Sequence, residues 1–266
     1  MPEQNINEEQ RQVINYLKKH PVKIFPYTFP KKYERKKIKV FLDETNQLLY
    51  VFQDKKKLYF KRSWTRRDVR NNYNDLLIEQ DEQSPHRYLN KDFTVQEGSV
   101  VVDIGTAEGN FALSVIDKVS MMYLFETDTE WIEALNATFA PWSNKVKIIN
   151  KYVSDRNDEH SVSLNSYFKD AQQVDFLKID VDGAELKLLN GSLGILNKRR
   201  SLKMAICTYH KQGDEKIFTE FLKDAGFEVS PSAGYMIFIY DKHFEPPYLR
   251  RGLLRAEKKY GFSNRS

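Results

Sequence analysis

From residue 98 onward, short apolar segments alternate with amphipathic ones, and this alternation limits the folds that the chain can adopt. Seven apolar segments are predicted to be strands: 99–105, 121–128, 146–153, 174–180, 203–209, 227–231 and 235–240. Amphipathic helices are predicted between them at 109–118, 129–140, 184–196 and 214–227. Continuous apolar strands that alternate with helices are typical of a parallel sheet covered on both faces. The last two strands are separated only by a Ser-Ala-Gly turn, which predicts an antiparallel edge.

The first 83 residues have a different pattern. A helix is predicted over 7–20, because Val13, Ile14 and Leu17 share one side of it. Strands are predicted at 38–42, 47–52 and 57–61, and a second helix at 65–81. We therefore predict a small α/β appendage at 1–83, which binds substrate or mediates dimerisation. A main α/β domain at 84–246 and a basic tail at 247–266 are predicted to follow.

Composition narrows the functional classes. Lys and Arg number 42 against 37 Asp and Glu, so the net charge of +5 is too small to require a nucleic-acid partner. Cys207 is the single cysteine, which excludes an internal disulfide framework and a cysteine-based zinc site. No apolar run reaches the length of a membrane span, and the first twenty residues are polar. We predict a cytoplasmic protein without a membrane span.

The segment VVVDIGTAEGNF at 100–111 is the first strand of the alternating region and its outgoing loop, where ligands of such sheets bind. The loop lacks the G-x-G-x-x-G of dinucleotide-binding folds and the Gly-Lys-Ser/Thr of a Walker loop. Glu126 ends the second strand, where a carboxylate can accept both hydroxyls of a ribose. Asp103 and Glu108 would repel a pyrophosphate and suit a cationic ligand. These residues favour S-adenosylmethionine as the cofactor.

Four segments together resemble the FkbM family of methyltransferases: VVVDIGTAEGNF, LFETD at 124–128, SVSLNSYFKDAQQVDFLKIDVDGAELKLLNG at 161–191 and AICTYH at 205–210. The resemblance covers roughly residues 84–240. It implies a class I, Rossmann-like three-layer sandwich with a mostly parallel seven-stranded sheet and an antiparallel terminal strand. It also implies O-methylation of a sugar or a glycosylated metabolite. The chain departs from that family at two places. Asn165 replaces the aspartate that usually follows a leucine after the third strand, and Cys207 and Thr208 occupy the region of the fifth strand where the family often has an acidic residue.

The cofactor site is predicted from the loop and the following strand ends. The resemblance implies that the loop holds the methionine part of the cofactor and that Ser154 and Asp155 meet the adenine. Alternatively, Ser154 and Asp155 are residues of a surface turn, because serine and aspartate are also common in turns. The complete predicted set is Asp103, Gly105, Thr106, Glu108, Gly109, Glu126, Thr127, Ser154, Asp155 and Asp180.

Two residues are candidates for proton transfer. Asp180 ends the fourth strand and His210 follows the fifth, so both are expected in the crevice beyond the sheet. Histidine is suited to accept a proton from a sugar hydroxyl near neutral pH. Asp182 and Glu185 have the spacing of a helix capping box, and we therefore predict no metal. His86, Arg87 and Tyr88 are predicted to lie near the substrate.

The predicted function is in-line transfer of a methyl group to a hydroxyl of a small-molecule or glycan acceptor. Two alternatives remain open. One is an RNA methyltransferase that uses the basic appendage, although the Asn/Asp-Pro-Pro-Tyr/Phe sequence of many amino-methylating enzymes is missing. The other is a protein that binds the cofactor without chemistry. The sequence leaves homodimerisation open.

Overall fold

The computed structural model describes residues 6–168, 173–198, 201–241, 243, 245, 246 and 248–258. Its centre is a seven-stranded sheet with the strand order β11-β12-β10-β9-β4-β5-β6. The five strands from β10 to β6 are parallel, β12 is antiparallel to β10, and β11 is antiparallel to β12. This arrangement confirms the predicted fold class. The strands are β4 (Ser99–Ile104), β5 (Val119–Phe125), β6 (Val146–Ile149), β9 (Phe176–Ile179), β10 (Leu202–Cys207), β11 (Glu228–Pro231) and β12 (Leu253–Lys258).

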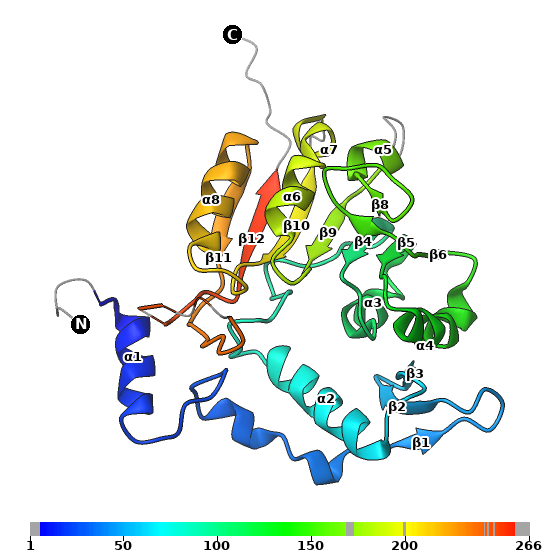
Figure 1. The fold of residues 1–266 in the computed structure, drawn as a ribbon, viewed down its shortest axis with the longest axis horizontal. Helices are drawn as coiled ribbons and strands as arrows, with labels where there is room; N and C mark the ends of the chain where they lie inside the picture. The colour runs from blue at the N-terminus through cyan, green and yellow to red at the C-terminus, as the bar shows by residue number, and fades with distance from the viewer. Residues whose placement is uncertain are drawn as a thin grey trace.

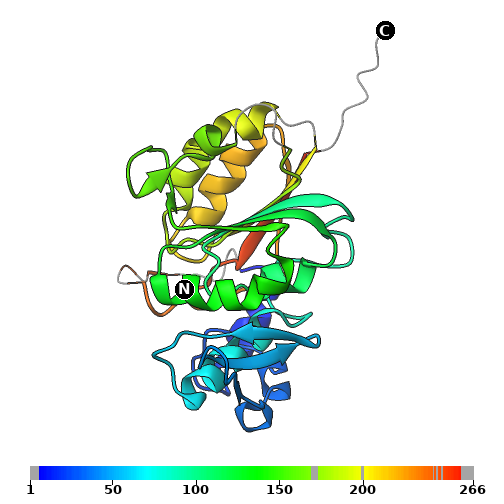
Figure 2. The same ribbon diagram turned by 90° about the vertical axis from the view of Figure 1, so that its right-hand side faces the viewer.

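Helices cover both faces of this sheet, as Figures 1 and 2 show. On β4 the side chains alternate between the two cores: Val101 packs with one helix layer and Val102 with the other. Both valines are fully buried, which explains why the strand is a continuous apolar run. One layer is formed by α3 (Asn110–Val115) and α4 (Thr129–Phe139), with η4 (Ala140–Trp142) after them. The other is formed by α5 (Leu164–Tyr167), α6 (Glu185–Asn190), α7 (Leu193–Lys198) and α8 (Asp214–Asp224), beside the short pair β7 (Tyr152–Val153) and β8 (Ser161–Val162).

The N-terminal appendage lies under the α3 and α4 layer (Figure 2). It consists of α1 (Glu8–Leu17), η2 (Phe29–Lys32), η3 (Arg35–Lys37), β1 (Phe41–Leu42), β2 (Leu49–Gln53), β3 (Lys56–Tyr59) and α2 (Arg66–Glu79). These elements confirm the predicted helices and strands with shifted boundaries. Thr65 and Asp68 form a capping box at the start of α2. The appendage shares one hydrophobic cluster with α3 and α4, and Arg62 pairs with Glu133 of α4 at 2.6 Å.

The predicted last strand at 235–240 is wrong. Met236 forms only an isolated bridge with Arg250, and Tyr235 and Ile237 pack against Val13 of α1. The apolar character of this segment therefore comes from its contact with the N-terminal region.

The strand that completes the sheet is β12, which lies inside the predicted basic tail at 247–266. Leu253, Leu254 and Ala256 are fully buried in it. The neighbouring charged residues Arg255 and Glu257 hide this pattern in the sequence. The sheet thus extends beyond residue 246. Among the described residues, no helix has the length and apolarity needed to cross a bilayer.

The position of β12 predicts how two apolar residues differ in their contribution to stability. Leu254→Ala removes a fully buried side chain and should lower the free energy of unfolding by about 2–5 kcal/mol. Ile239→Ala is the matched control, because Ile239 is 51% exposed, and it should cost no more than about 0.5 kcal/mol. Urea denaturation measures both values. Equal losses in the two variants would contradict the observed sheet.

Candidate active site

The glycine loop between β4 and α3 passes directly beside the end of β9. Asp180 donates its backbone N–H to the carbonyl of Ile104 at 3.1 Å, which joins the two strand ends. Gly105 has a φ of +72°, and a Cβ atom there would lie 1.9 Å from the backbone oxygen of Asp180. Only glycine fits this position. Gly109, with a φ of +82°, begins α3. The loop therefore needs both of its glycines, as its sequence suggests.

Glu126, at the end of β5, fastens the loop. Its Oε2 accepts the N–H of Ala107 at 2.8 Å, and its Oε1 accepts the N–H groups of Thr127 and Asp128 at 2.7 and 2.9 Å. The carboxylate therefore lies at the loop, where the sequence places it. Its contact with a ribose stays a prediction.

Buried acidic side chains surround the loop. Asp103 is fully buried, and its Oδ1 pairs with Nζ of Lys178 at 3.1 Å. Burial raises the pKa of Asp103 to about 6, although the charge of Lys178 lowers it. Burial also raises the pKa of Glu108 to about 7. These groups lack sufficient positive charge around them, so a cationic ligand fits this site. Thr106 has a structural contact: its hydroxyl donates to the carbonyl of Asp103 at 3.0 Å.

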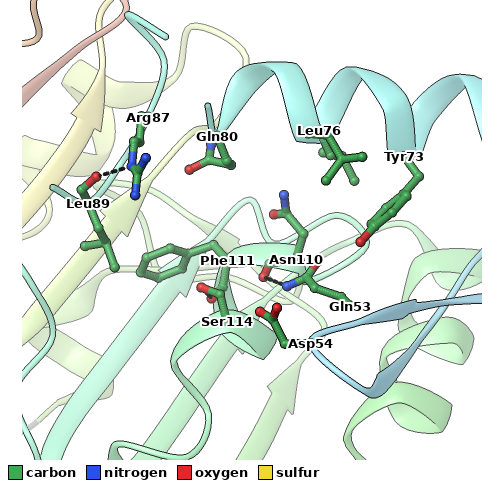
Figure 3. A pocket seen from close by; sticks show the side chains of 11 residues that line it. Gln53, Asp54, Tyr73, Leu76, Gln80, Arg87, Leu89, Asn110, Phe111 and Ser114 are labelled. Carbon is green, nitrogen blue, oxygen red and sulfur yellow. Dashed lines mark hydrogen bonds between the residues drawn. The ribbon is translucent and has the colours of Figure 1, made fainter. Parts of the chain in front are cut away.

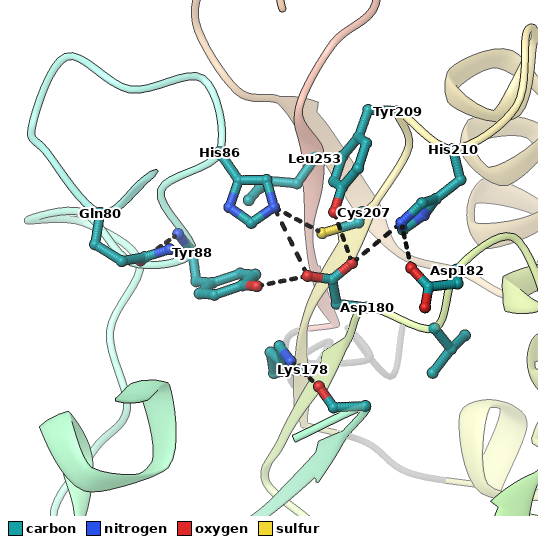
Figure 4. Close-up of polar contacts among 12 residues, drawn as sticks. Gln80, His86, Tyr88, Lys178, Asp180, Asp182, Cys207, Tyr209, His210 and Leu253 are labelled. Carbon is teal, nitrogen blue, oxygen red and sulfur yellow. Dashed lines mark hydrogen bonds and ion pairs between the residues drawn. The ribbon is translucent and has the colours of Figure 1, made fainter. Parts of the chain in front are cut away.

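Asp180 is the centre of a polar cluster at the ends of β9 and β10 (Figure 4). Tyr88 and Tyr209 donate their hydroxyls to it at 2.8 and 3.1 Å. The Nε2 atoms of His86 and His210 lie 3.7 and 3.6 Å from its carboxylate oxygens. Burial would raise the pKa of Asp180, but the charges of Lys178 and both histidines and the bond from Tyr88 lower it to about 2. Asp180 is thus held ionised.

The two histidines of this cluster differ in charge. Burial lowers the pKa of His86 to about 4, so this ring is neutral at pH 7. Burial would also lower the pKa of His210, but Asp182, Glu185 and Asp180 raise it to about 10. Its Nδ1 lies 2.8 Å from Glu185, which is fully buried. A protonated His210 cannot accept a proton, whereas His86 can.

The predicted capping box at 182–185 is wrong. The residue before α6 is Ala184, which has no side-chain cap, and Asp182 has a φ of +49°. Asp182 instead lies 3.5 Å from Nε2 of His210, while Glu185 accepts the N–H of Val181 at 3.2 Å. Both carboxylates therefore hold His210.

Two groups of side chains bring potential metal ligands within 4.8 Å of one another. One contains His86, Asp180 and Cys207, and the other contains Asp180, Glu185 and His210. In the second group the imidazolium of His210 already supplies a positive charge to the carboxylates. The absence of a metal stays a prediction.

The other predicted residues are less closely connected. Ser154 donates to Asp155 at 3.0 Å, and its carbonyl lies 2.0 Å from where a Cβ on Gly191 would be. This places the pair beside the junction of α6 and α7, and their contact with adenine stays a prediction. Arg87 donates to the carbonyl of Leu89 at 2.8 Å and lines a cavity of about 330 Å³ between α2 and α3 (Figure 3).

Sequence reasoning names Lys178 only as a possible partner of Asp180, and it missed two other residues of the site. Lys178 instead pairs with Asp103 and donates to the carbonyl of Gly105 at 2.6 Å. Tyr209 precedes His210, and its burial was not evident. Glu79, at the end of α2, has its pKa raised well above the usual value by burial and by the charges of Asp180 and Glu108. No sequence pattern connects Glu79 to the site.

The sheet order and the glycine loop are those of the class I, Rossmann-like methyltransferase fold. The family model described as "Methyltransferase FkbM domain" matches residues 66–233, more than half of the chain. The chain therefore belongs to the FkbM methyltransferase family, as its motifs predict. The match begins at α2, so it includes part of the predicted appendage.

One solved structure shares this fold, and a second is similar over most of its length. A methyltransferase FkbM from Methylobacillus flagellatus KT aligns at 16% identity and a TM-score of 0.50, over 72% of this chain and 53% of that one. The present chain thus spans about half the length of that relative. TYW2 of M. jannaschii, solved in complex with AdoMet, aligns at 12% identity and a TM-score of 0.46, over 84% and 93% of the two chains. No curated protein sequence matches the chain.

The close approach of the loop to β9 predicts different effects of two glycine substitutions. Gly98 and Gly105 both have positive φ, but a Cβ on Gly98 meets nothing within 4 Å. Gly98→Ala should cost about 1–2 kcal/mol of stability through its backbone alone. Gly105→Ala should cost more and should weaken S-adenosylmethionine binding by more than about tenfold (about 1.4 kcal/mol). Urea denaturation and calorimetry measure both effects. Similar results for the two variants would show that the loop tolerates a side chain.

The raised pKa values of the buried acids predict how cofactor affinity depends on pH. Asp103 and Glu108, with pKa values of about 6 and 7, are increasingly protonated as the pH falls. A protonated carboxyl no longer attracts a sulfonium, so affinity should fall by about three- to tenfold between pH 7.5 and 6. Calorimetry of S-adenosylmethionine binding across this range tests the effect. Glu108→Gln should flatten the profile, and an affinity that rises as the pH falls would contradict the assignment.

Proposed function

We propose that this protein transfers a methyl group from S-adenosylmethionine to a hydroxyl of a sugar, in a glycan or glycosylated metabolite. The observation that supports this proposal most is the Asp180 cluster. It combines an ionised carboxylate, two histidines and two tyrosine hydroxyls at the strand ends beside the loop. Such a group of donors and acceptors suits a hydroxyl-rich acceptor.

The residues of the loop fit the cofactor. S-adenosylmethionine, when bound, supplies a methyl group on a positively charged sulfur. Asp103 and Glu108 would offset that charge, since both are buried and the pKa of Asp103 stays raised despite its ion pair with Lys178. Glu126 would hold the ribose hydroxyls. The Asp180 side of the site then faces the acceptor.

Proton removal is proposed to fall to His86, with Asp180 positioning the acceptor. As the new C–O bond forms and the C–S bond breaks, the acceptor oxygen becomes acidic, so a weak base suffices. His86 is neutral, and its Nδ1 has no hydrogen-bond partner among the described residues. His210, proposed from the sequence as a base, is assigned here to hold Asp180 ionised. Most of the rate would come from alignment of oxygen, carbon and sulfur.

A variant of His86 and the pH dependence of kcat separate the roles of the two histidines. His86→Asn should lower kcat by about 10²-fold or more and leave S-adenosylmethionine affinity nearly unchanged. With His86 as the base, kcat should be flat above about pH 5, because its pKa is about 4. If His210 is the base, kcat should instead rise with pH toward about 10, the pKa of His210. Steady-state kinetics at saturating substrate between pH 6 and 9.5 measures the profile.

The acceptor class is tested with one panel. Purified protein and S-adenosylmethionine are incubated with nucleotide-sugars, oligosaccharides and RNA, and products are analysed by mass spectrometry. Methylated sugars support the proposal. Methylated RNA replaces it with a nucleic-acid methyltransferase, and tight cofactor binding without any product indicates a protein that binds without chemistry.

A further inference from the structure

A second polar pocket lies on the appendage, away from the Asp180 cluster. It has a volume of about 380 Å³, lies between α2 and η3, and is lined by Arg35, Lys36, Arg67, Arg70 and Asn71. Four of these five side chains are cationic. Within the described part of the chain, none of the four forms an ion pair with a carboxylate, unlike the neighbouring Lys37, which pairs with Glu34 at 2.7 Å.

The acids nearest to this pocket leave its charge available. The charge of Arg67 contributes to a lowered pKa of Asp68, but the hydrogen bonds of the Asp68 carboxylate are to Thr65. Burial raises the pKa of Asp75, and the charge of Arg35 partly offsets this rise. Neither makes an ion pair with the pocket arginines. The pocket therefore carries unbalanced positive charge.

Two of the three arginines are held by hydrogen bonds that leave other N–H groups of each guanidinium free. Arg67, Arg70 and Asn71 are three and four residues apart, so they share one side of α2. Arg35 donates to the side chain of Asn71 at 3.1 Å, and Arg70 donates to the carbonyl of Ile38 at 3.3 Å. Each guanidinium keeps further N–H groups. Fixed guanidinium forks are the side chains that best bind phosphate and sulfate oxygens.

A second hollow, which contains aromatic side chains, lies along the same helix α2. It has a volume of about 420 Å³ and includes Lys39, Phe41, Phe52 and Tyr73 among its lining residues. The rings of Phe41 and Phe52 lie 5.4 Å apart, and the two residues are 36% and 48% exposed. Exposed aromatic surface beside an anion site suits a sugar that carries an anionic group. It distinguishes this surface from a purely electrostatic patch.

Helix α2 connects this surface to the candidate active site. The side chain of Gln80, directly after α2, accepts the N–H of Tyr88 at 3.3 Å, and Tyr88 bonds to Asp180. The helix rises 1.5 Å per residue, so Arg67 and Gln80 lie about 20 Å apart. An acceptor that reaches both places must be several sugar units long.

We propose that this pocket binds the phosphate or sulfate ester of an oligosaccharide, and that the hydroxyl to be methylated lies beyond the far end of α2, at Asp180. The second part rests on the proposed sugar methylation, whereas the anion site stands by itself. A compact pocket with four cations favours one discrete anionic group. A nucleic-acid strand would need a continuous track of phosphate contacts.

The test measures binding by calorimetry to the full chain. The probes are glucose 6-phosphate, glucose 6-sulfate, neutral glucose and a single-stranded oligouridylate. Arg67→Gln/Arg70→Gln removes two charges from the pocket. Lys18→Gln/Lys19→Gln is the matched control, because it removes two exposed charges just after α1. Urea denaturation checks that both variants remain folded.

We expect an anionic sugar to bind more tightly than glucose, and the arginine variant to lose at least about tenfold in affinity (about 1.4 kcal/mol). The lysine variant should change by less than about twofold. The preferred ester identifies the anion. Equal losses in both variants, unchanged affinity in the arginine variant, or tighter, steeply salt-dependent binding of oligouridylate would each overturn the proposal. S-adenosylmethionine binding, measured in parallel, should be unaffected, so a failure of the cofactor assignment would be seen separately.

Discussion

The arrangement of the site depends on one buried lysine. Lys178 projects from the central strand β9, is 4% exposed, pairs with Asp103 and donates to the carbonyl of Gly105. Its charge also helps to keep Asp180 ionised. Removal of one partner from a buried pair leaves an uncompensated charge, which typically costs about 3–5 kcal/mol. The lysine thus holds the ends of β4 and β9 together, and with them the loop.

One lysine does not supply enough positive charge to balance the acidic side chains around the glycine loop. Asp103, Glu108 and Asp180 lie around it, and Glu79 adds a fourth acid from the appendage. Such a site disfavours a pyrophosphate and favours a sulfonium. At the ends of β9 and β10, burial lowers the pKa of His86, whereas three nearby carboxylates raise the pKa of His210. The two rings therefore differ in charge at neutral pH.

Much of the central domain could be predicted because its strands are buried on both faces and are therefore apolar throughout. β12 could not, since it alternates buried Leu254 and Ala256 with charged Arg255 and Glu257. The segment at 235–240 was wrongly predicted to be a strand of the sheet. It is apolar because its residues pack against the N-terminal region. An apolar segment indicates burial, but it does not say against which part of the chain the segment packs.

The site was predictable to a similar degree. The loop, Glu126 and Asp180 follow strand ends, whose positions are set by the order of the elements. The pairing of His210 with Glu185 could not be predicted from the sequence, because Asp182 and Glu185 have the spacing of a helix capping box. The contribution of α2 was also invisible, since contacts between distant segments leave no local pattern.

Calorimetry with S-adenosylmethionine, S-adenosylhomocysteine and a nicotinamide dinucleotide tests the central claim most directly. We expect both sulfur-containing nucleosides to bind the purified chain with one site each, and the dinucleotide not to bind. Binding of the dinucleotide, with no heat from either nucleoside, would show that the acidic loop holds a different ligand and would contradict the account.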